Sequence, residues 1–175
     1  QTDESTSELI SDQQHVTYLR RYELHFGAGD RPPPADEPHA EQLTALKCIL
    51  DDGSVPYVDF AIFGPHASRL ARKMRLQGTK FRSDGSLGPI EIHGPCDVDT
   101  WDSCWKVFQT AMLMLNAVDL GVLHQYQDRI LSLARMYGPD CWLILYQTDV
   151  RARLEHAVRV KLDLIDQHTT SLSRG

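Results

Sequence analysis

The chain has no long hydrophobic run and no paired cysteines. None of its apolar stretches approaches the about 20 residues that cross a bilayer, and no secretory hydrophobic segment stands at its start. Its cysteines, Cys48, Cys96, Cys104 and Cys141, show no CxxC spacing. These absences predict a soluble protein in a reducing intracellular compartment, the cytoplasm or the nucleus.

Motifs for catalysis and nucleotide binding are also missing. The chain has neither a glycine-rich phosphate loop nor a nucleophile elbow. His93 and Cys96 lie close together and Cys104 follows, but no second pair completes a four-ligand zinc site. Cys104 and Cys141 each precede a tryptophan in an apolar helical pattern, which favours burial of both thiols. The sequence therefore predicts no catalytic residue, metal or cofactor, although an enzyme of unfamiliar type using a cysteine or histidine stays open.

Size and charge set further bounds. The 175 residues, 42% of them hydrophobic, suit one domain with a core. The formal net charge of −6 argues against generic nucleic-acid binding, because such proteins are usually basic. Since the chain begins with Gln1 and not with Met, we expect it to be a fragment or a processed piece.

Proline, glycine and polar residues divide the chain into three parts. Residues 1–35 are polar and end in Gly27-Ala-Gly-Asp-Arg-Pro-Pro-Pro34, which cannot continue a helix or a strand ladder. We expect a flexible N-terminal tail here, with Val16–Phe26 as a short strand or helix that docks onto the body or a partner. Residues 36–166 are predicted to form one globular helical domain, and residues 167–175 a C-terminal tail.

Hydrophobic spacing predicts a mainly α fold with a small β-hairpin (α+β), a compact unit of about five helices. The first helix is expected from Pro38 to Asp51 with Asp36 as its N-cap. The apolar stretch Pro56–Pro65 suits a buried strand or an extended core segment. A short basic helix is expected from Pro65 to about Leu76.

Three more helices are expected after Asp97, packed antiparallel because their connections are short. Asp99 or Thr100 is the expected cap of the first, and Asn116 is its expected end. Asp119 is predicted to cap the second, and Gly138-Pro139 to separate it from the last.

The hairpin is predicted over residues 77–93, with Asp84-Gly85 as a two-residue type I′ turn. That turn places Thr79 opposite Ile90 and Phe81 opposite Gly88. One face then holds Thr79, Phe81, Ile90 and Ile92, and the other holds Lys80, Arg82 and Glu91. Pro89 requires an open edge, because it cannot donate to a ladder.

A run of cations without acids lies between Pro65 and Ser83 in an otherwise acidic chain. Its members are Arg69, Arg72, Lys73, Arg75, Lys80 and Arg82, and they are the candidate nucleic-acid-binding residues. The alternative is a solvated face whose cations balance nearby carboxylates. No aromatic platform interleaves with the cations, which weakens the case for single-strand binding.

Several strings have a family likeness: Pro56-Tyr-Val-Asp-Phe-Ala-Ile-Phe-Gly-Pro65, Ile92-His-Gly-Pro95, Trp105-Lys-Val-Phe-Gln-Thr-Ala-Met112 and Leu145-Tyr-Gln-Thr-Asp-Val-Arg-Ala-Arg-Leu-Glu155. Over about residues 38–162 the chain resembles the gag-like region of uncharacterised protist mobile-element (retrotransposon-like) polyproteins. The resemblance implies self-association, with nucleic-acid contact shared with a downstream Cys/His-rich module. It transfers no catalytic residue.

We therefore expect a non-enzymatic, gag-like association domain of a mobile-element polyprotein that contacts RNA or DNA weakly through the basic run. The alternative is a protein–protein adaptor without nucleic-acid binding, which docks a partner through Tyr18–Phe26 or the final helix. No membrane partner and no small-molecule ligand is expected.

Overall fold

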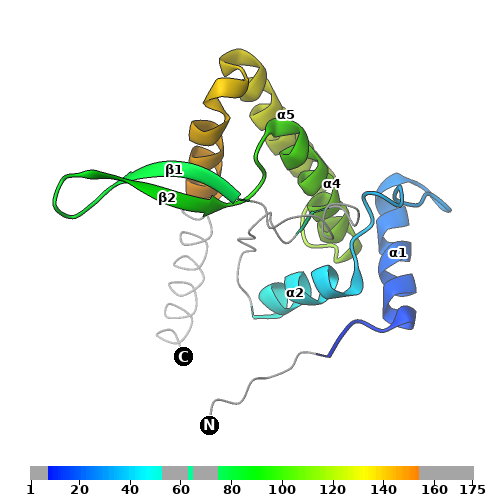
Figure 1. Cartoon of the computed structure of the whole chain (residues 1–175). Coiled ribbons are helices and arrows are strands. Elements are labelled where there is room, and N and C mark those ends of the chain that lie inside the picture. Colours follow the sequence, from blue (N-terminus) through cyan, green and yellow to red (C-terminus); the bar gives the residue numbers. More distant parts are fainter. Residues whose placement is uncertain (1–7, 53–62, 65–74, 154–175) are drawn as a thin grey trace, which may run out of the picture.

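The computed structural model describes residues 8–52, 63–64 and 75–153, which form a mainly α fold with one β-hairpin (Figure 1). The predicted fold class is confirmed. In chain order the elements are α1 (Asp12–Phe26), α2 (Ala40–Asp51), β1 (Arg75–Phe81), β2 (Leu87–His93), α4 (Val98–Met114), α5 (Leu120–Tyr137) and the 3-10 helix η2 (Pro139–Cys141). Residues 142–153, which follow η2, are helical as well. None of the described helices combines the length and hydrophobicity needed to cross a membrane.

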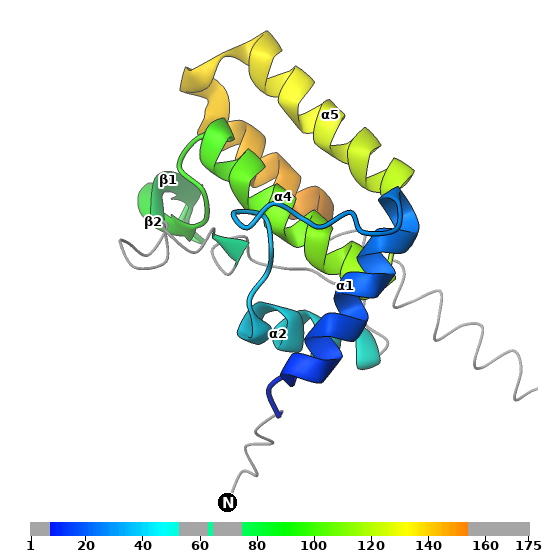
Figure 2. The same ribbon diagram turned by 90° about the vertical axis from the view of Figure 1, so that its right-hand side faces the viewer.

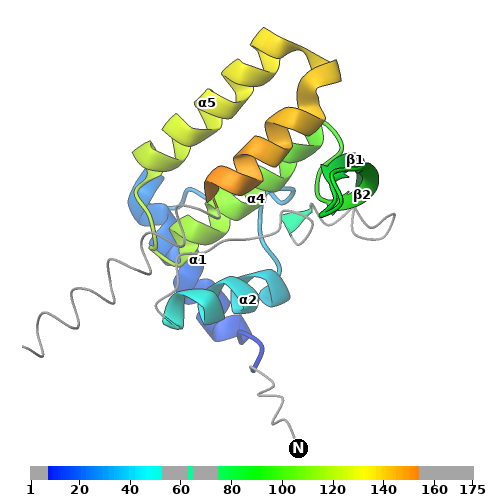
Figure 3. The same cartoon turned by 90° about the vertical axis from the view of Figure 1, so that its left-hand side faces the viewer.

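Helix α4 is the centre of the fold. It contacts α1, α2 and α5, and Figures 2 and 3 show it lying beside α5 and residues 142–153. Trp101, Cys104 and Leu113 in α4 are fully buried. The apolar residues of α4 cover more of its circumference than those of a surface helix do. A helix of this kind is buried with neighbours on several sides, and α4 has such neighbours.

The start of α4 differs from the expected one. Asp97 is the N-cap, and its carboxylate accepts a hydrogen bond from the backbone N–H of Thr100 at 2.7 Å. The predicted caps, Asp99 and Thr100, lie inside the first turn instead. Three candidate cap residues follow one another closely here, and only the backbone conformation selects among them.

The predicted end of α4 at Asn116 is correct. Asn116 has φ +53°, a left-handed conformation that asparagine tolerates better than most residues. The N–H of Asn116 donates to Leu113 O at 3.0 Å and that of Ala117 to Met112 O at 2.9 Å, which is a Schellman motif. Asp119 then caps α5, as predicted, by accepting from the N–H of Gly121.

Residues 12–26 correct the prediction of a flexible tail over 1–35. They form α1, the helical alternative expected for Val16–Phe26, and α1 packs on α4. Tyr18 and Tyr22 are buried one turn apart on one face. The N–H of Ile10 donates to Thr44 Oγ1 at 3.1 Å, which ties the start of α1 to α2. The sequence gives only a weak signal for this helix, because only a narrow face of it is apolar and the rest is polar.

Helix α2 begins at Ala40 with His39 as its N-cap, so the predicted cap at Asp36 is wrong. Leu43 and Leu46 are fully buried, as their spacing predicted. Of the apolar stretch Pro56–Pro65, only residues 63 and 64 are described, and Phe63 is fully buried.

The predicted basic helix over Pro65–Leu76 falls mostly on residues 65–74, outside the described part of the chain. Its expected end is wrong, because Arg75 and Leu76 belong to strand β1. The proposed C-terminal tail, residues 167–175, also lies outside the described residues.

The hairpin exists, but its turn and register differ from the prediction. Arg82 N donates to Ser86 O at 2.8 Å, and Gly85 N donates to Arg82 O at 3.0 Å with Gly85 at φ +80°. This is a three-residue loop with a left-handed glycine, not a two-residue type I′ turn.

The strand register is therefore shifted by one residue. Thr79 is opposite Pro89 and Phe81 is opposite Leu87. A one-residue slip exchanges the faces of one strand relative to the other, so the two predicted faces are wrong. Asp84-Gly85 suits either turn, and the Asp84 carboxylate selects the longer one by accepting a hydrogen bond from Ser86 N at 2.9 Å.

The base of the hairpin is anchored to the helical body. The indole N–H of Trp142 donates to Pro95 O at 3.0 Å in a buried hydrogen bond. Gly94, which has φ +152° and follows β2, lies so close to Tyr146 that a Cβ atom would collide with the phenol. Beyond this anchor the two strands extend away from the helices (Figure 1).

Replacing Gly94 with alanine should destabilise the fold, because the new methyl group would displace the fully packed Tyr146 ring. Overpacking of this kind costs about 1–3 kcal/mol, and urea unfolding followed by circular dichroism would measure it. Gly29→Ala is the matched control, since Gly29 also has positive φ (+87°) but no atom near its missing Cβ. Equal losses in the two variants would show that backbone conformation alone matters.

Candidate association surface

An apolar groove lies between α5 and the helical residues 142–153. Its volume is about 400 Å³ and its walls are Leu133, Tyr137, Cys141, Ile144, Leu145 and Thr148. Tyr137 is 60% exposed and Ile144 is 67% exposed. Met136, next to Tyr137 on α5, is 72% exposed. The face thus combines protruding apolar side chains with a concave apolar strip.

The reversal of the chain after α5 brings the two walls together. Gly138 ends α5 with φ +76°, and Pro139 follows at the start of η2. A left-handed glycine followed by proline stops a helix sharply, so residues 142–153 run back along α5 (Figure 3). The predicted break at Gly138-Pro139 is confirmed.

A buried polar network fastens the same two helices. The Asp149 side chain is 1% exposed and accepts from the Tyr126 hydroxyl of α5. Arg153 donates to Asp149 Oδ2 from Nε at 3.1 Å and from Nη2 at 3.0 Å. Buried charges persist only where they are paired and hydrogen-bonded, and both conditions hold here.

The electrostatics of this network keep each proton in place. Burial raises the pKa of Tyr126 well above its ordinary value, and the adjacent Asp149 carboxylate raises it further. Burial opposes the charge on Arg153, but Asp149 holds the pKa of Arg153 above its ordinary value. The phenol therefore stays a hydrogen-bond donor and the guanidinium stays charged throughout the physiological pH range.

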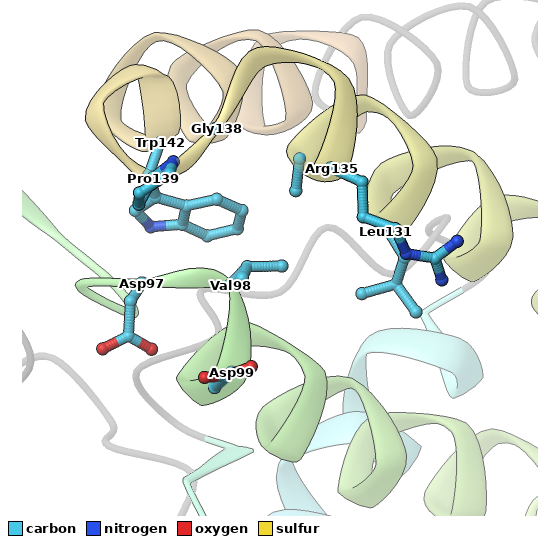
Figure 4. A pocket seen from close by; sticks show the side chains of 9 residues that line it. Asp97, Val98, Asp99, Leu131, Arg135, Gly138, Pro139 and Trp142 are labelled. Atoms are coloured by element: carbon cyan, nitrogen blue, oxygen red, sulfur yellow. The ribbon is translucent and has the colours of Figure 1, made fainter.

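A second cleft, of about 320 Å³, lies where the start of α4 meets the end of α5 (Figure 4). The indole of Trp142 forms its apolar wall over Val98. Asp97 and Asp99 line one side and Arg135 the other. Hydrogen bonding from the N–H of Thr100 lowers the pKa of Asp97. Because carboxylates and a guanidinium line opposite walls, the cleft favours neither an anionic nor a cationic ligand.

The candidate nucleic-acid residues are only partly described. Arg69, Arg72 and Lys73 lie outside the described residues. Arg75 and Lys80 stand at opposite ends of β1, and Arg82 is exposed where the hairpin loop begins. The Arg82 guanidinium lies over Gly88, in the space that a larger residue would fill. Three of the six cations therefore belong to the hairpin, two in β1 and one at the start of its loop.

The described residues place the four cysteines in different surroundings. Cys104 is buried as predicted, but Cys141 is only half-buried, because it lies in η2 at the mouth of the turn after α5. Cys48 is also half-buried and Cys96 is exposed, and none of the four forms a disulfide. Within residues 8–52, 63–64 and 75–153, no group of three or more His, Cys, Asp or Glu side chains is placed to hold a metal ion.

Comparison of the chain with models of protein families, with curated proteins and with solved structures finds no match. The fold and its surfaces therefore define the chain as a mainly α domain with a projecting hairpin, and its function has to be argued from these surfaces.

Hydrophobic spacing alone does not reveal that Tyr137 and Ile144 stay exposed, because their exposure depends on which side of each helix packs against its neighbours. The Tyr126–Asp149–Arg153 network was also missed. The i,i+4 spacing of Asp149 and Arg153 was its only sequence signal.

Removing one partner of the buried network should destabilise the fold strongly. Asp149→Ala leaves the Arg153 guanidinium buried without its counter-ion, which should cost about 3–5 kcal/mol, whereas Tyr126→Phe should cost about 1–2 kcal/mol. Denaturant unfolding would measure both changes. Asp51→Ala removes an exposed i,i+4 pair, between Lys47 and Asp51 on α2, and should change little. Similar losses from Asp149→Ala and Asp51→Ala would contradict this role.

Proposed function

We propose that the chain is a non-enzymatic association domain whose copies contact one another through the apolar face formed by α5 and residues 142–153. The apolar groove carries the proposal. Apolar surface that is gathered in one place on a folded protein often marks a binding site. Here Tyr137 and Ile144, which line the groove, are both more than half exposed.

Self-association is favoured over an unrelated partner because one patch holds both protruding side chains and a hollow. Ile144 and Tyr137 protrude, while Leu133, Cys141 and Leu145 are half-buried walls. In a two-fold contact the same patch serves both copies, so the protruding residues of one copy fill the hollow of the other. The Tyr126–Asp149–Arg153 network holds both helices of the face in one arrangement, which lowers the entropic cost of binding.

A gag-like role in a mobile-element polyprotein is compatible with such a domain and stays a prediction. Nucleic-acid contact belongs to the same proposal. It is supported by Arg75, Lys80 and Arg82 on a hairpin that extends away from the acidic body (Figure 1). Two or more associated copies would present several such arms, and weak phosphate contacts that act together gain in total affinity.

Ile144→Lys should weaken self-association at least about tenfold, because a charge replaces an isoleucine whose full burial contributes about 1.5–3 kcal/mol. Light scattering over a concentration series would measure the effect. Val122→Lys is the matched control, since Val122 is also on α5 and 57% exposed but lies outside the groove. Unchanged association of the Ile144 variant would contradict the proposal.

The triple variant Arg75→Glu, Lys80→Glu and Arg82→Glu should weaken binding to a labelled oligonucleotide. It should also flatten the dependence of log Kd on log salt by about three units if each cation meets one phosphate. Arg20→Glu, Arg129→Glu and Arg135→Glu, which are exposed on α1 and α5, form a control of equal charge change. Equal weakening by both sets, or no salt-dependent binding at all, would overturn nucleic-acid contact through the hairpin.

A further inference from the structure

The two outer edges of the hairpin differ in their hydrogen-bonding groups. Among the described residues the sheet consists of β1 and β2 alone. Arg82 and Ser86 form a hydrogen-bonded pair, and antiparallel ladders alternate between bonded and non-bonded pairs. The N–H and C=O groups directed away from the partner strand therefore belong to odd-numbered residues, which in β1 are Arg75, Gln77, Thr79 and Phe81.

Pro89 interrupts the outer edge of β2. It stands opposite Thr79, in a non-bonded pair, so its missing N–H removes no bond between the two strands. The missing N–H would have been one of the outward-facing backbone groups of β2, and a further strand would need all of these groups to form a continuous ladder. The outer row of β1 contains no proline and keeps every donor and acceptor. An edge of this kind is a template for another strand.

We propose that the free edge of β1 pairs with β1 of a second copy, antiparallel and about a two-fold axis at Gly78. This contact extends the proposed function, since it adds a second self-association surface that is separate from the apolar face. It supplies backbone hydrogen bonds, whereas the apolar face supplies hydrophobic burial.

The residue order of β1 favours its own copy as the added strand. Pairing about Gly78 sets Arg75 opposite Phe81 and Gln77 opposite Thr79, so all outward groups of both strands are bonded. Lys80 then stands opposite Leu76. No cation faces another cation directly, which matters because opposed like charges destabilise a strand pair.

Glycine at the two-fold axis suits this register. Gly78 would face Gly78 of the second copy in a non-bonded pair, where the Cα atoms approach to about 4.5 Å. The closest point of the contact would therefore carry no side chain. Within the hairpin, Gly78 is opposite Ile90.

Pro89 also limits growth through the sheet. The paired hairpins would form a four-stranded sheet with β2 at both outer edges, each interrupted by Pro89. Strand pairing alone would thus close at a dimer. Two different two-fold contacts on one chain, through β1 and through the apolar face, link copies into assemblies larger than dimers.

Cross-linking tests the register directly. In the full chain carrying Cys96→Ser, which removes the exposed thiol, Gly78→Cys should form a disulfide-linked dimer under mild oxidation. A Cα separation near 4.5 Å lies within the range that disulfides bridge. Lys80→Cys is the control, because two copies of residue 80 would stand about 13 Å apart along the strands. A non-reducing gel should show dimer at least about tenfold sooner for Gly78→Cys.

Light scattering separates the two contacts. Gln77→Pro removes one outward N–H from β1, and Glu91→Pro, opposite it in β2, is the matched control on the other edge. We expect wild type and Glu91→Pro to exceed dimer mass, Gln77→Pro and Ile144→Lys each to stop at dimers, and the double variant Gln77→Pro/Ile144→Lys to be a monomer.

The outcomes distinguish the two proposals. If Gln77→Pro matches Glu91→Pro and residue 78 cross-links no faster than residue 80, pairing through β1 is wrong, even where Ile144→Lys lowers the mass. If only Gln77→Pro lowers it, the apolar face is wrong and β1 pairing holds. If the chain stays monomeric while the thiol of Gly78→Cys is protected from reaction, a different strand covers the edge of β1, and self-pairing is wrong.

Discussion

A row of aromatic rings along α4 holds the other elements in place. The ring centroids of Trp101 and Trp105 are 5.3 Å apart in a stacked pair, and Trp105 also stacks on Tyr126 of α5, with the centroids 5.2 Å apart. Phe108 continues the row and meets Phe63 edge-on at 5.4 Å. Because aromatic side chains bury large areas with specific geometry, this row fixes which side of α5 faces inward. The apolar groove and the buried Tyr126–Asp149–Arg153 network depend on that choice.

The orientation of α5 has opposite consequences for its two sides. The inner side carries Tyr126, which reaches the buried Asp149, so a charged network closes the space between α5 and residues 142–153. The outer side keeps Tyr137 and Met136 in solvent. A buried ion pair contributes specificity of arrangement more than net stability, and here it sets the geometry of the apolar groove. The rigid pair of helices and the extended hairpin are thus two different kinds of surface on one small fold.

Local signals in the sequence were sufficient to predict those helix ends at which a single residue satisfies the free backbone groups. Asn116 and Asp119 act as expected because an asparagine in left-handed conformation and an aspartate before a helix satisfy backbone groups within a few residues. Prediction failed where several neighbours offered the same chemistry, as at Asp97. It also failed at the hairpin, where Asp84-Gly85 fits two turn types and the choice moves the register by one residue. Helix α1 was assigned to a tail because two buried tyrosines in a polar segment are a weak signal.

The sequence by itself determined the mainly α class, the presence of a hairpin and the sharp break at Gly138-Pro139, because helix period, caps and turn residues act over short distances along the chain. It also placed the cations together in sequence. Only the tertiary structure decided which apolar residues stay exposed, since the burial of Ile144 or Tyr137 depends on what packs against each helix. The same holds for the Tyr126–Asp149 contact, 23 residues apart in the chain, and for the edge of β1, whose free groups follow from the strand register. Contacts between distant segments are set by packing in three dimensions, and no local pattern encodes them.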